Sequence, residues 1–197
     1  MKLWLLFLGT IIVLSVIIII TLKPDQTFKK SSTQISNLIG GEFSLLNQNA
    51  QPVTENFFLG NYALIFFGFT YCPDVCPTVL QTVSVSLDLL GKVATKIKPV
   101  FITIDPERDT PSVLKSYLEN FHPFITGLTG TPDQVKKVAK AYGVYYARAK
   151  EGKESKDNYF MDHSGGIYLM GPDGKFIKRF SHSVTPEEIV DKIKESL

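Results

Sequence analysis

The chain of 197 residues contains two cysteines, and they lie four residues apart. Cys72 and Cys76 follow an apolar run predicted to be a buried strand, and they precede a predicted helix. Open α/β sheets place their functional sites at this carboxyl end of a strand. Because Pro77 suits the first position of a helix, we expect Cys76 at or near the N-cap, where backbone N–H groups and the helix dipole favour a thiolate.

The spacing of the pair fits two kinds of chemistry. Residues four apart on a helix share a face, with Cβ atoms about 5–6 Å apart. This separation allows a disulfide after a small adjustment, and it also allows two sulfurs to bind one metal ion. A disulfide that closed so short a loop would add little stability, so a reactive or ligating pair is the favoured interpretation. The spacing does not choose between redox and metal chemistry.

His163 is the candidate for a third ligand. It lies shortly before a predicted strand at 167–170, and if that strand is adjacent to a strand at 63–67, the preceding loop can approach the cysteines. His122 is interpreted instead as a turn residue with structural hydrogen bonds, and His182 as a solvated residue near the C-terminal hairpin. The predicted imidazole ligand is therefore His163.

Two thiolates and one imidazole are soft to borderline donors. They suit copper in a trigonal site better than closed tetrahedral zinc, which needs a fourth ligand. Met161 or Met170 could supply a weak axial sulfur, although each is favoured as a core residue. Asp162 could orient the imidazole, and an orientation toward solvent fits it equally well.

The hydrophobic pattern predicts an α/β domain with a mixed sheet. The apolar runs 63–67 and 100–104 are typical of strands buried on both faces, and a helix from Thr78 to Val93, ended near Gly91, is predicted between them. A strand–helix–strand order gives parallel pairing through a right-handed crossover. The expected architecture is therefore a mixed sheet flanked by helices.

Caps and turns mark the remaining elements. Three threonine–proline pairs each place an N-cap before a proline at the first helical position: Thr110-Pro111, Thr131-Pro132 and Thr185-Pro186. The helix after Thr131 is expected to end at Tyr142-Gly143. A first hairpin around 43–53, a strand at 144–147 and a last hairpin joining 167–170 to 175–180 complete the predicted order.

The N-terminal segment predicts a membrane anchor. Residues 3–22 are almost wholly apolar, which is about the length needed to cross a bilayer core. We expect residues 1–23 to be an uncleaved transmembrane helix, because signal peptides have shorter apolar cores and end in small residues. Residues 24–40 then form a polar tether, and residues 41–197 form one domain.

The 21 basic and 19 acidic residues nearly balance, with a net charge of +2. This balance does not indicate binding of nucleic acid, which favours a strongly basic surface.

Four segments, taken in order, resemble a known family. They are 67–77 with both cysteines, 104–110, 121–131 and 162–169, and together they resemble the Sco/SenC family of copper chaperones. The likeness covers nearly all of the chain after the tether. Within 104–110, the residues Asp105 to Thr110 predict a strand-end turn with a helix cap and a local pair between Arg108 and a carboxylate. This structural interpretation is slightly favoured over a role in docking a partner.

The resemblance implies a fold, a metal and a partner. It implies a thioredoxin-like domain that binds copper through Cys72, Cys76 and His163. It also implies assembly of the dinuclear copper centre of cytochrome c oxidase subunit II, with an upstream copper donor or thiol reductant as a further partner. The domain is then expected to face the periplasm from a bacterial inner membrane, or the intermembrane space from a mitochondrial inner membrane.

Two rival functions use the same cysteines. A membrane-tethered thiol–disulfide reductase would use Cys72 and Cys76 as its catalytic pair on the cysteines of the oxidase copper site. Thioredoxins carry a cis-proline that helps hold a polypeptide where this chain has 164–166, which weakens a general oxidoreductase interpretation. A peroxidase of the peroxiredoxin kind is disfavoured, because Phe69 stands where that class has Thr or Ser, three residues before the reactive cysteine.

Overall fold

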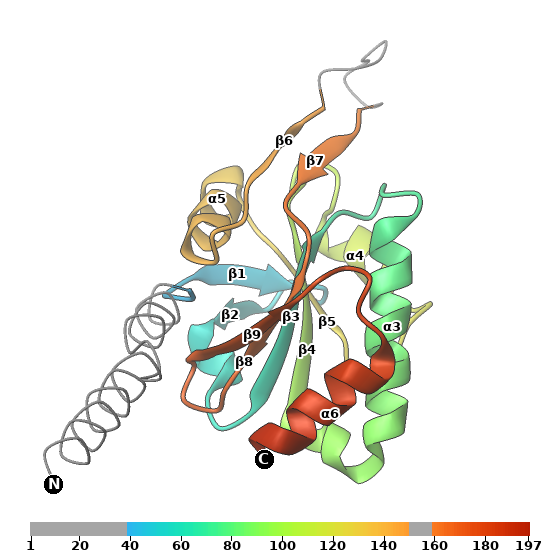
Figure 1. The fold of residues 1–197 in the computed structure, drawn as a ribbon. Helices are drawn as coiled ribbons and strands as arrows, with labels where there is room; N and C mark the ends of the chain where they lie inside the picture. The colour runs from blue at the N-terminus through green and yellow to red at the C-terminus, as the bar shows by residue number, and fades with distance from the viewer. Residues whose placement is uncertain (1–38, 150–158) are drawn as a thin grey trace, which may run out of the picture. The chain divides into compact units, whose positions relative to one another are not determined.

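The structure is a computed structural model that describes residues 39–149 and 159–197. These residues form a seven-stranded mixed sheet, helices that flank it, and a separate two-stranded ribbon (Figure 1). The strand order in the sheet is β2-β1-β5-β4-β3-β8-β9. These strands are β1 (Ser44–Asn47), β2 (Pro52–Thr54), β3 (Tyr62–Gly68), β4 (Ile97–Thr103), β5 (Thr126–Thr129), β8 (Ile167–Met170) and β9 (Phe176–Phe180).

The central strand β3 is buried at all seven residues. It pairs in parallel with β4, where Phe66 is opposite Phe101, and antiparallel with β8, where Phe66 is opposite Ile167. A strand covered on both faces has no polar side, which explains its continuous apolar sequence. The condition stated for His163, that these two strands are adjacent, is thus met, and the pairing brings the segment before β8 to the end of β3 from which the cysteine loop departs.

Three helices begin where the threonine–proline pairs predict: α4 (Pro111–Leu118), α5 (Pro132–Ala141) and α6 (Pro186–Ser196). The other helical elements described are α3 (Val75–Leu90) and the 3-10 helices η1 (Glu55–Phe58) and η2 (Gly91–Lys96). At α5, the Thr131 hydroxyl accepts the N–H of Gln134, and the Gln134 side chain accepts the N–H of Thr131. Helices α3 and α6 pack together on one face of the sheet, and α5 lies on the other side (Figure 1).

Three strands differ from the prediction. The predicted strand 144–147 is β6 (Tyr146–Arg148), which pairs with the unpredicted β7 (Met161–His163) outside the main sheet. Strand β5 was not predicted because Gly127 weakens its apolar pattern. A Cβ at Gly127 would lie 2.6 Å from Leu118 Cδ1, so a larger residue there would have to displace that side chain of α4 from β5.

The predicted transmembrane helix lies outside the described residues. Residues 1–23 and nearly all of the predicted tether 24–40 fall before residue 39, where the description begins. Among the helices that the structure does describe, none combines the length and apolar character needed to cross a membrane. The anchor and the domain boundaries therefore stay predictions.

Candidate metal centre

Helix α3 begins three residues earlier than predicted, and this changes the position of Cys76. Its N-cap is Asp74, so Cys76 is the second helical residue: it lies near the N-cap, as predicted, but not at it. Proline is tolerated here because the first N–H groups of a helix have no intrahelical partner. Pro77 therefore does not mark the first helical residue, and Thr78 N–H already donates to Asp74 O at 3.2 Å.

The two cysteines lie together and are both free thiols. Cys76 N–H donates to Cys72 Sγ at 3.4 Å, and Cys76 is fully buried whereas Cys72 is partly exposed. The hydrogen bond from the Cys76 side chain lowers the pKa of Cys72 to about 5, with burial opposing and backbone N–H groups assisting. The same hydrogen bond, together with burial, raises the pKa of Cys76. The pair thus carries one negative charge near neutral pH, on the accessible sulfur.

Gly68, the last residue of β3, makes room for the buried sulfur. A Cβ at this position would lie 2.8 Å from Cys76 Sγ and 2.8 Å from the Phe101 ring. Real Cβ atoms do not approach so closely, so any larger residue would displace the cysteine or the aromatic core. The position of Cys76 therefore depends on a glycine in the strand.

His163 lies at the end of β7, against the aromatic residues that lead to the cysteine loop. Its ring packs edge-on against Phe66 and Phe69, with centroids 6.4 Å and 6.2 Å away. Burial lowers the pKa of His163, while the hydrogen-bond partner Ser164 O and the charge of Cys72 oppose this effect. The imidazole is therefore neutral near pH 7, as a metal ligand must be.

The structure brings the three predicted ligands into one neighbourhood without joining them. Within residues 39–149 and 159–197, no three His, Cys, Asp or Glu side chains are grouped closely enough to hold a metal ion. The paired cysteines form one unit, and His163 is separated from them while packing on Phe69, three residues before Cys72. Ligation by all three side chains stays a prediction, and it requires the imidazole to approach the sulfurs.

The other residues considered as ligands or as partners of the imidazole lie away from the cysteines or make no hydrogen bond to the His163 ring. His122 is a turn residue: its N–H donates to Ser84 Oγ at 3.0 Å, and its Nδ1 accepts the N–H of Phe124. His182 is exposed, and so is Asp162, whose carboxylate makes no hydrogen bond to the His163 ring. Met170 is a core residue opposite Ala63, at the far end of β3 from the cysteines.

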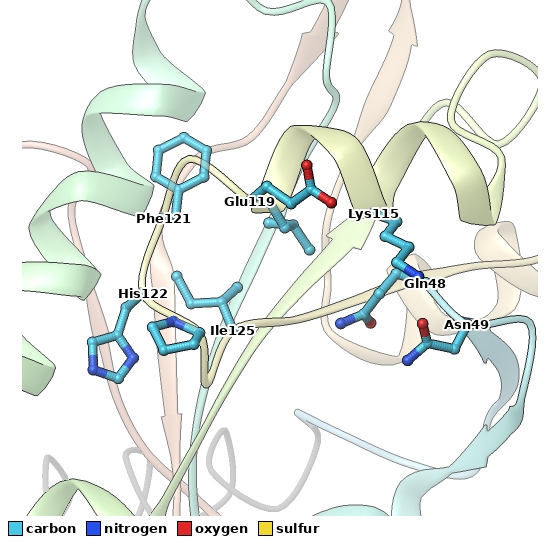
Figure 2. A pocket seen from close by; sticks show the side chains of 9 residues that line it. Gln48, Asn49, Lys115, Glu119, Phe121, His122 and Ile125 are labelled. Atoms are coloured by element: carbon cyan, nitrogen blue, oxygen red, sulfur yellow. The ribbon is translucent and has the colours of Figure 1, made fainter.

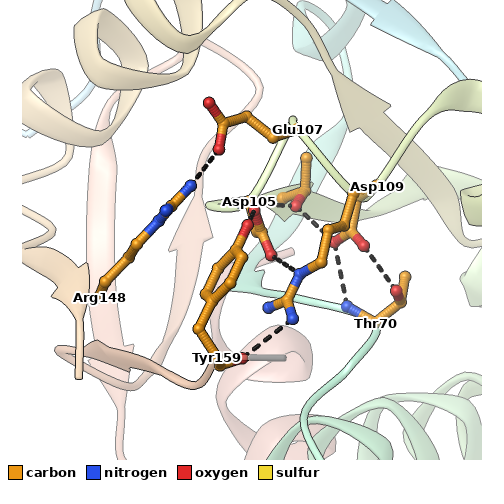
Figure 3. A network of polar contacts seen from close by, with 8 residues as sticks. Thr70, Asp105, Glu107, Asp109, Arg148 and Tyr159 are labelled. Atoms are coloured by element: carbon orange, nitrogen blue, oxygen red, sulfur yellow. Dashed lines mark hydrogen bonds and ion pairs between the residues drawn. The ribbon is translucent and has the colours of Figure 1, made fainter. Parts of the chain in front are cut away.

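Asp109 holds the cysteine loop, and sequence analysis missed this role. The carboxylate is fully buried and accepts hydrogen bonds from Thr70 N–H at 3.0 Å, Thr70 Oγ1 at 2.5 Å and Thr103 Oγ1 at 2.6 Å (Figure 3). Burial raises the pKa of Asp109, and these hydrogen bonds oppose the shift. Its position directly before the Thr110 cap suggested only a turn, because the partner Thr70 is 39 residues away in the sequence.

The pocket shown in Figure 2 is a different place on the molecule. It has a volume of about 310 Å³ and includes Lys115, Glu119 and His122 among its lining residues. None of the predicted copper ligands lines it. The cysteine pair instead lies on a loop and the first turn of α3, with Cys72 partly exposed and Cys76 buried.

Comparison with known proteins identifies the family. A family model described as SCO1/SenC matches residues 31–197. The chain belongs to the SCO1/SenC family. The resemblance inferred from the four segments is confirmed, and the thioredoxin-like α/β fold expected of this SCO1/SenC protein is the fold observed.

The relatives of this SCO1/SenC chain include bacterial and yeast proteins. A SCO2-like protein of Rickettsia felis is 46% identical over 156 residues, which are 79% of this chain and 76% of that protein. The structure of Bradyrhizobium japonicum ScoI with copper bound is 45% identical, with a TM-score of 0.74 over 81% of this chain and 99% of that chain. The crystal structure of yeast Sco1 with copper bound is 42% identical, with a TM-score of 0.73, covering 80% and 87% of the two chains.

Proposed function

We propose that this protein is a membrane-anchored copper chaperone that helps to assemble the dinuclear copper centre of cytochrome c oxidase. The observation that carries the proposal is the paired cysteines, one of them charged near neutral pH, beside a neutral histidine. Two similar structures in the same family contain copper. Copper is here the cargo that the protein takes up and passes on.

The three proposed ligands, Cys72, Cys76 and His163, supply what copper prefers. Soft thiolates select Cu(I), and imidazole suits copper in either oxidation state. Cys72 is already deprotonated near neutral pH, whereas Cys76 releases its proton when the metal binds. His163 belongs to a ribbon that is not hydrogen-bonded to the seven-stranded sheet, so it can shift toward the sulfurs without breaking a sheet ladder.

The partly exposed side of the site fits transfer by ligand exchange. An incoming thiolate of the acceptor can approach Cys72, while Cys76 remains covered by the core. Oxidation would join Cys72 and Cys76 in a disulfide with loss of two protons and two electrons to an oxidant, and it would remove both sulfur ligands. The redox state of the pair then decides whether copper is held.

The acceptor and location follow from the same proposal. The copper-binding domain of oxidase subunit II is the proposed acceptor, and an upstream copper donor or a thiol reductant is the further partner. Residues 1–23 are the proposed single-pass anchor in a bacterial inner membrane, with the domain in the periplasm. A mitochondrial inner membrane with the domain in the intermembrane space is the alternative.

The second candidate function is a thiol–disulfide reductase. It is favoured by the asymmetry of the pair, since an acidic exposed thiol and a protonated buried thiol suit attack followed by resolution. In that function the thiolate of Cys72 attacks one sulfur of the oxidised target. Cys76 then displaces the target, leaving a reduced dithiol there and a disulfide here.

Two assays on the reduced domain separate these functions. Copper-loaded domain is mixed with reduced, metal-free subunit II domain, the two proteins are then separated, and copper transfer is followed by metal analysis of each. Metal-free domain is mixed with the oxidised acceptor, and its disulfide is followed by mass spectrometry. We expect the wild-type domain to transfer copper to the acceptor and the His163→Ala variant to lose this transfer. Fast acceptor reduction without any copper transfer would contradict the chaperone proposal and favour the reductase.

A further inference from the structure

Arg108 lies between the two segments that carry the proposed copper ligands. Its guanidinium stacks on the ring of Tyr71, 4.6 Å from the centroid, and on the ring of Tyr159, 3.6 Å from the centroid. Tyr71 directly precedes Cys72, and Tyr159 directly precedes the short segment that leads to His163. One side chain from the connection between β4 and α4 therefore contacts both halves of the site.

The guanidinium is fixed on its polar side as well. Arg108 Nε donates to Asp105 Oδ2 at 2.5 Å, and Nη1 donates to the carbonyl oxygen of Tyr159 at 2.9 Å (Figure 3). Tyr159 Oη donates to the other oxygen of Asp105 at 2.7 Å, which closes the cluster. Arg108 Nη2 is buried without a hydrogen-bond partner among the residues that the structure describes. Stacking is therefore a main part of what holds this group.

The ribbon of β6 and β7 depends on such an anchor. Its strands have three residues each, and they pair only with one another, with Tyr146 opposite His163. An isolated two-stranded pair is at best marginally stable in water. Arg148 of β6 also stacks on Tyr159, at 4.1 Å, and pairs with Glu107, but it is half exposed and does not contact the cysteine loop. Among the cation–π contacts within the described part of the chain, those of Arg108 alone link Tyr71 to Tyr159, next to the ribbon.

We propose that Arg108 is a positioning residue for copper capture: it holds the ribbon against the cysteine loop and so sets how closely His163 can approach Cys72 and Cys76. This inference rests on the proposed function. Arginine is required because a planar guanidinium can stack between two rings and donate in two directions at once. Lysine would keep the charge but would lose the stacking and one of the two directed hydrogen bonds.

The test measures copper retention by the reduced domain against a competing Cu(I) chelator. We expect Arg108→Lys to weaken copper binding about tenfold, as is usual for residues that orient a metal ligand. The matched control, Arg148→Lys, alters the exposed cation on the same tyrosine and should stay within about twofold of wild type. Tyr71→Leu, at an exposed position that does not threaten folding, should cost about threefold.

A double-mutant comparison distinguishes positioning from general weakening. If Arg108 acts through His163, Arg108→Lys should cause no further loss in a His163→Ala background. An equal tenfold loss in that background, or wild-type binding by Arg108→Lys, would overturn the inference while leaving the proposed function intact. Wild-type copper retention by His163→Ala would instead contradict the proposed ligand set, and the positioning role with it.

Discussion

Cys72 is expected to titrate as a strongly acidic thiol, while Cys76 stays protonated. The hydrogen bond from the Cys76 side chain is the main cause of the lowered pKa of Cys72, which is about 5. The change to test is Cys76→Ala, which removes this donor and leaves the assisting backbone N–H groups in place. We expect the variant to raise the pKa of Cys72 toward, though not fully to, the ordinary value of about 8.5.

The size of the effect decides how it must be measured. At pH 7 a thiol with a pKa of about 5 is about 99% thiolate, against about 3% for a thiol with a pKa of about 8.5, a gain of about 30-fold. The more acidic thiolate is also the weaker nucleophile, and the difference of about 3.5 between the pKa values lowers its intrinsic reactivity about 40-fold. The two effects nearly cancel at pH 7, so a rate at one pH is uninformative.

The dependence of alkylation on pH is therefore the assay. Metal-free, reduced protein is treated with iodoacetamide from pH 4 to 9, and the modification of each cysteine is resolved by peptide mass spectrometry. The rate at Cys72 should rise with a midpoint near pH 5 and level off above about pH 6, whereas Cys76 should react slowly throughout. A midpoint near 8.5 for Cys72, or one that Cys76→Ala leaves in place, would refute the reasoning.

Three further substitutions test the scaffold of the site by urea unfolding and copper retention. Gly68→Ala places a methyl group against Cys76, so it should lower the free energy of unfolding by about 1–3 kcal/mol and weaken copper retention; an unchanged variant would contradict the packing argument. Asp109→Ala removes the acceptor of three hydrogen bonds at the cysteine loop and should lower the free energy of unfolding by about 2 kcal/mol or more. A wild-type unfolding midpoint would contradict the proposed role of Asp109 in holding the loop. Thr131→Ala removes a helix cap remote from the cysteines and should cost about 1 kcal/mol with copper retention unchanged; weaker copper retention would contradict this separation.

The central sheet and the helix starts were predictable because their signals are local. The buried strand β3 is a continuous apolar run, and each threonine–proline pair gives both an N-cap and a proline suited to the first turn. The adjacency of β3 and β8 was a condition of the interpretation of His163 and not a prediction, and the register shows that this condition is met.

The elements missed have signals that depend on distant partners. Strand β7 consists of Met161, Asp162 and His163, whose pattern indicates no strand until β6 pairs with it. Asp109 was interpreted within a turn because its hydrogen-bond partner Thr70 belongs to another element. The start of α3 was misplaced because proline is compatible with several positions of a first turn. Sequence spacing indicated the candidate site residues, but not the side chains that hold them.

The central claim, that copper is bound by Cys72, Cys76 and His163, is tested most directly by X-ray absorption on the reduced, copper-loaded domain. Copper should be present at one equivalent, with two sulfur neighbours and one nitrogen neighbour. His163→Ala should lose the nitrogen and keep both sulfurs. A spectrum with sulfur neighbours alone in the wild-type protein, unchanged by His163→Ala, would contradict the account and leave a dithiol site without the histidine.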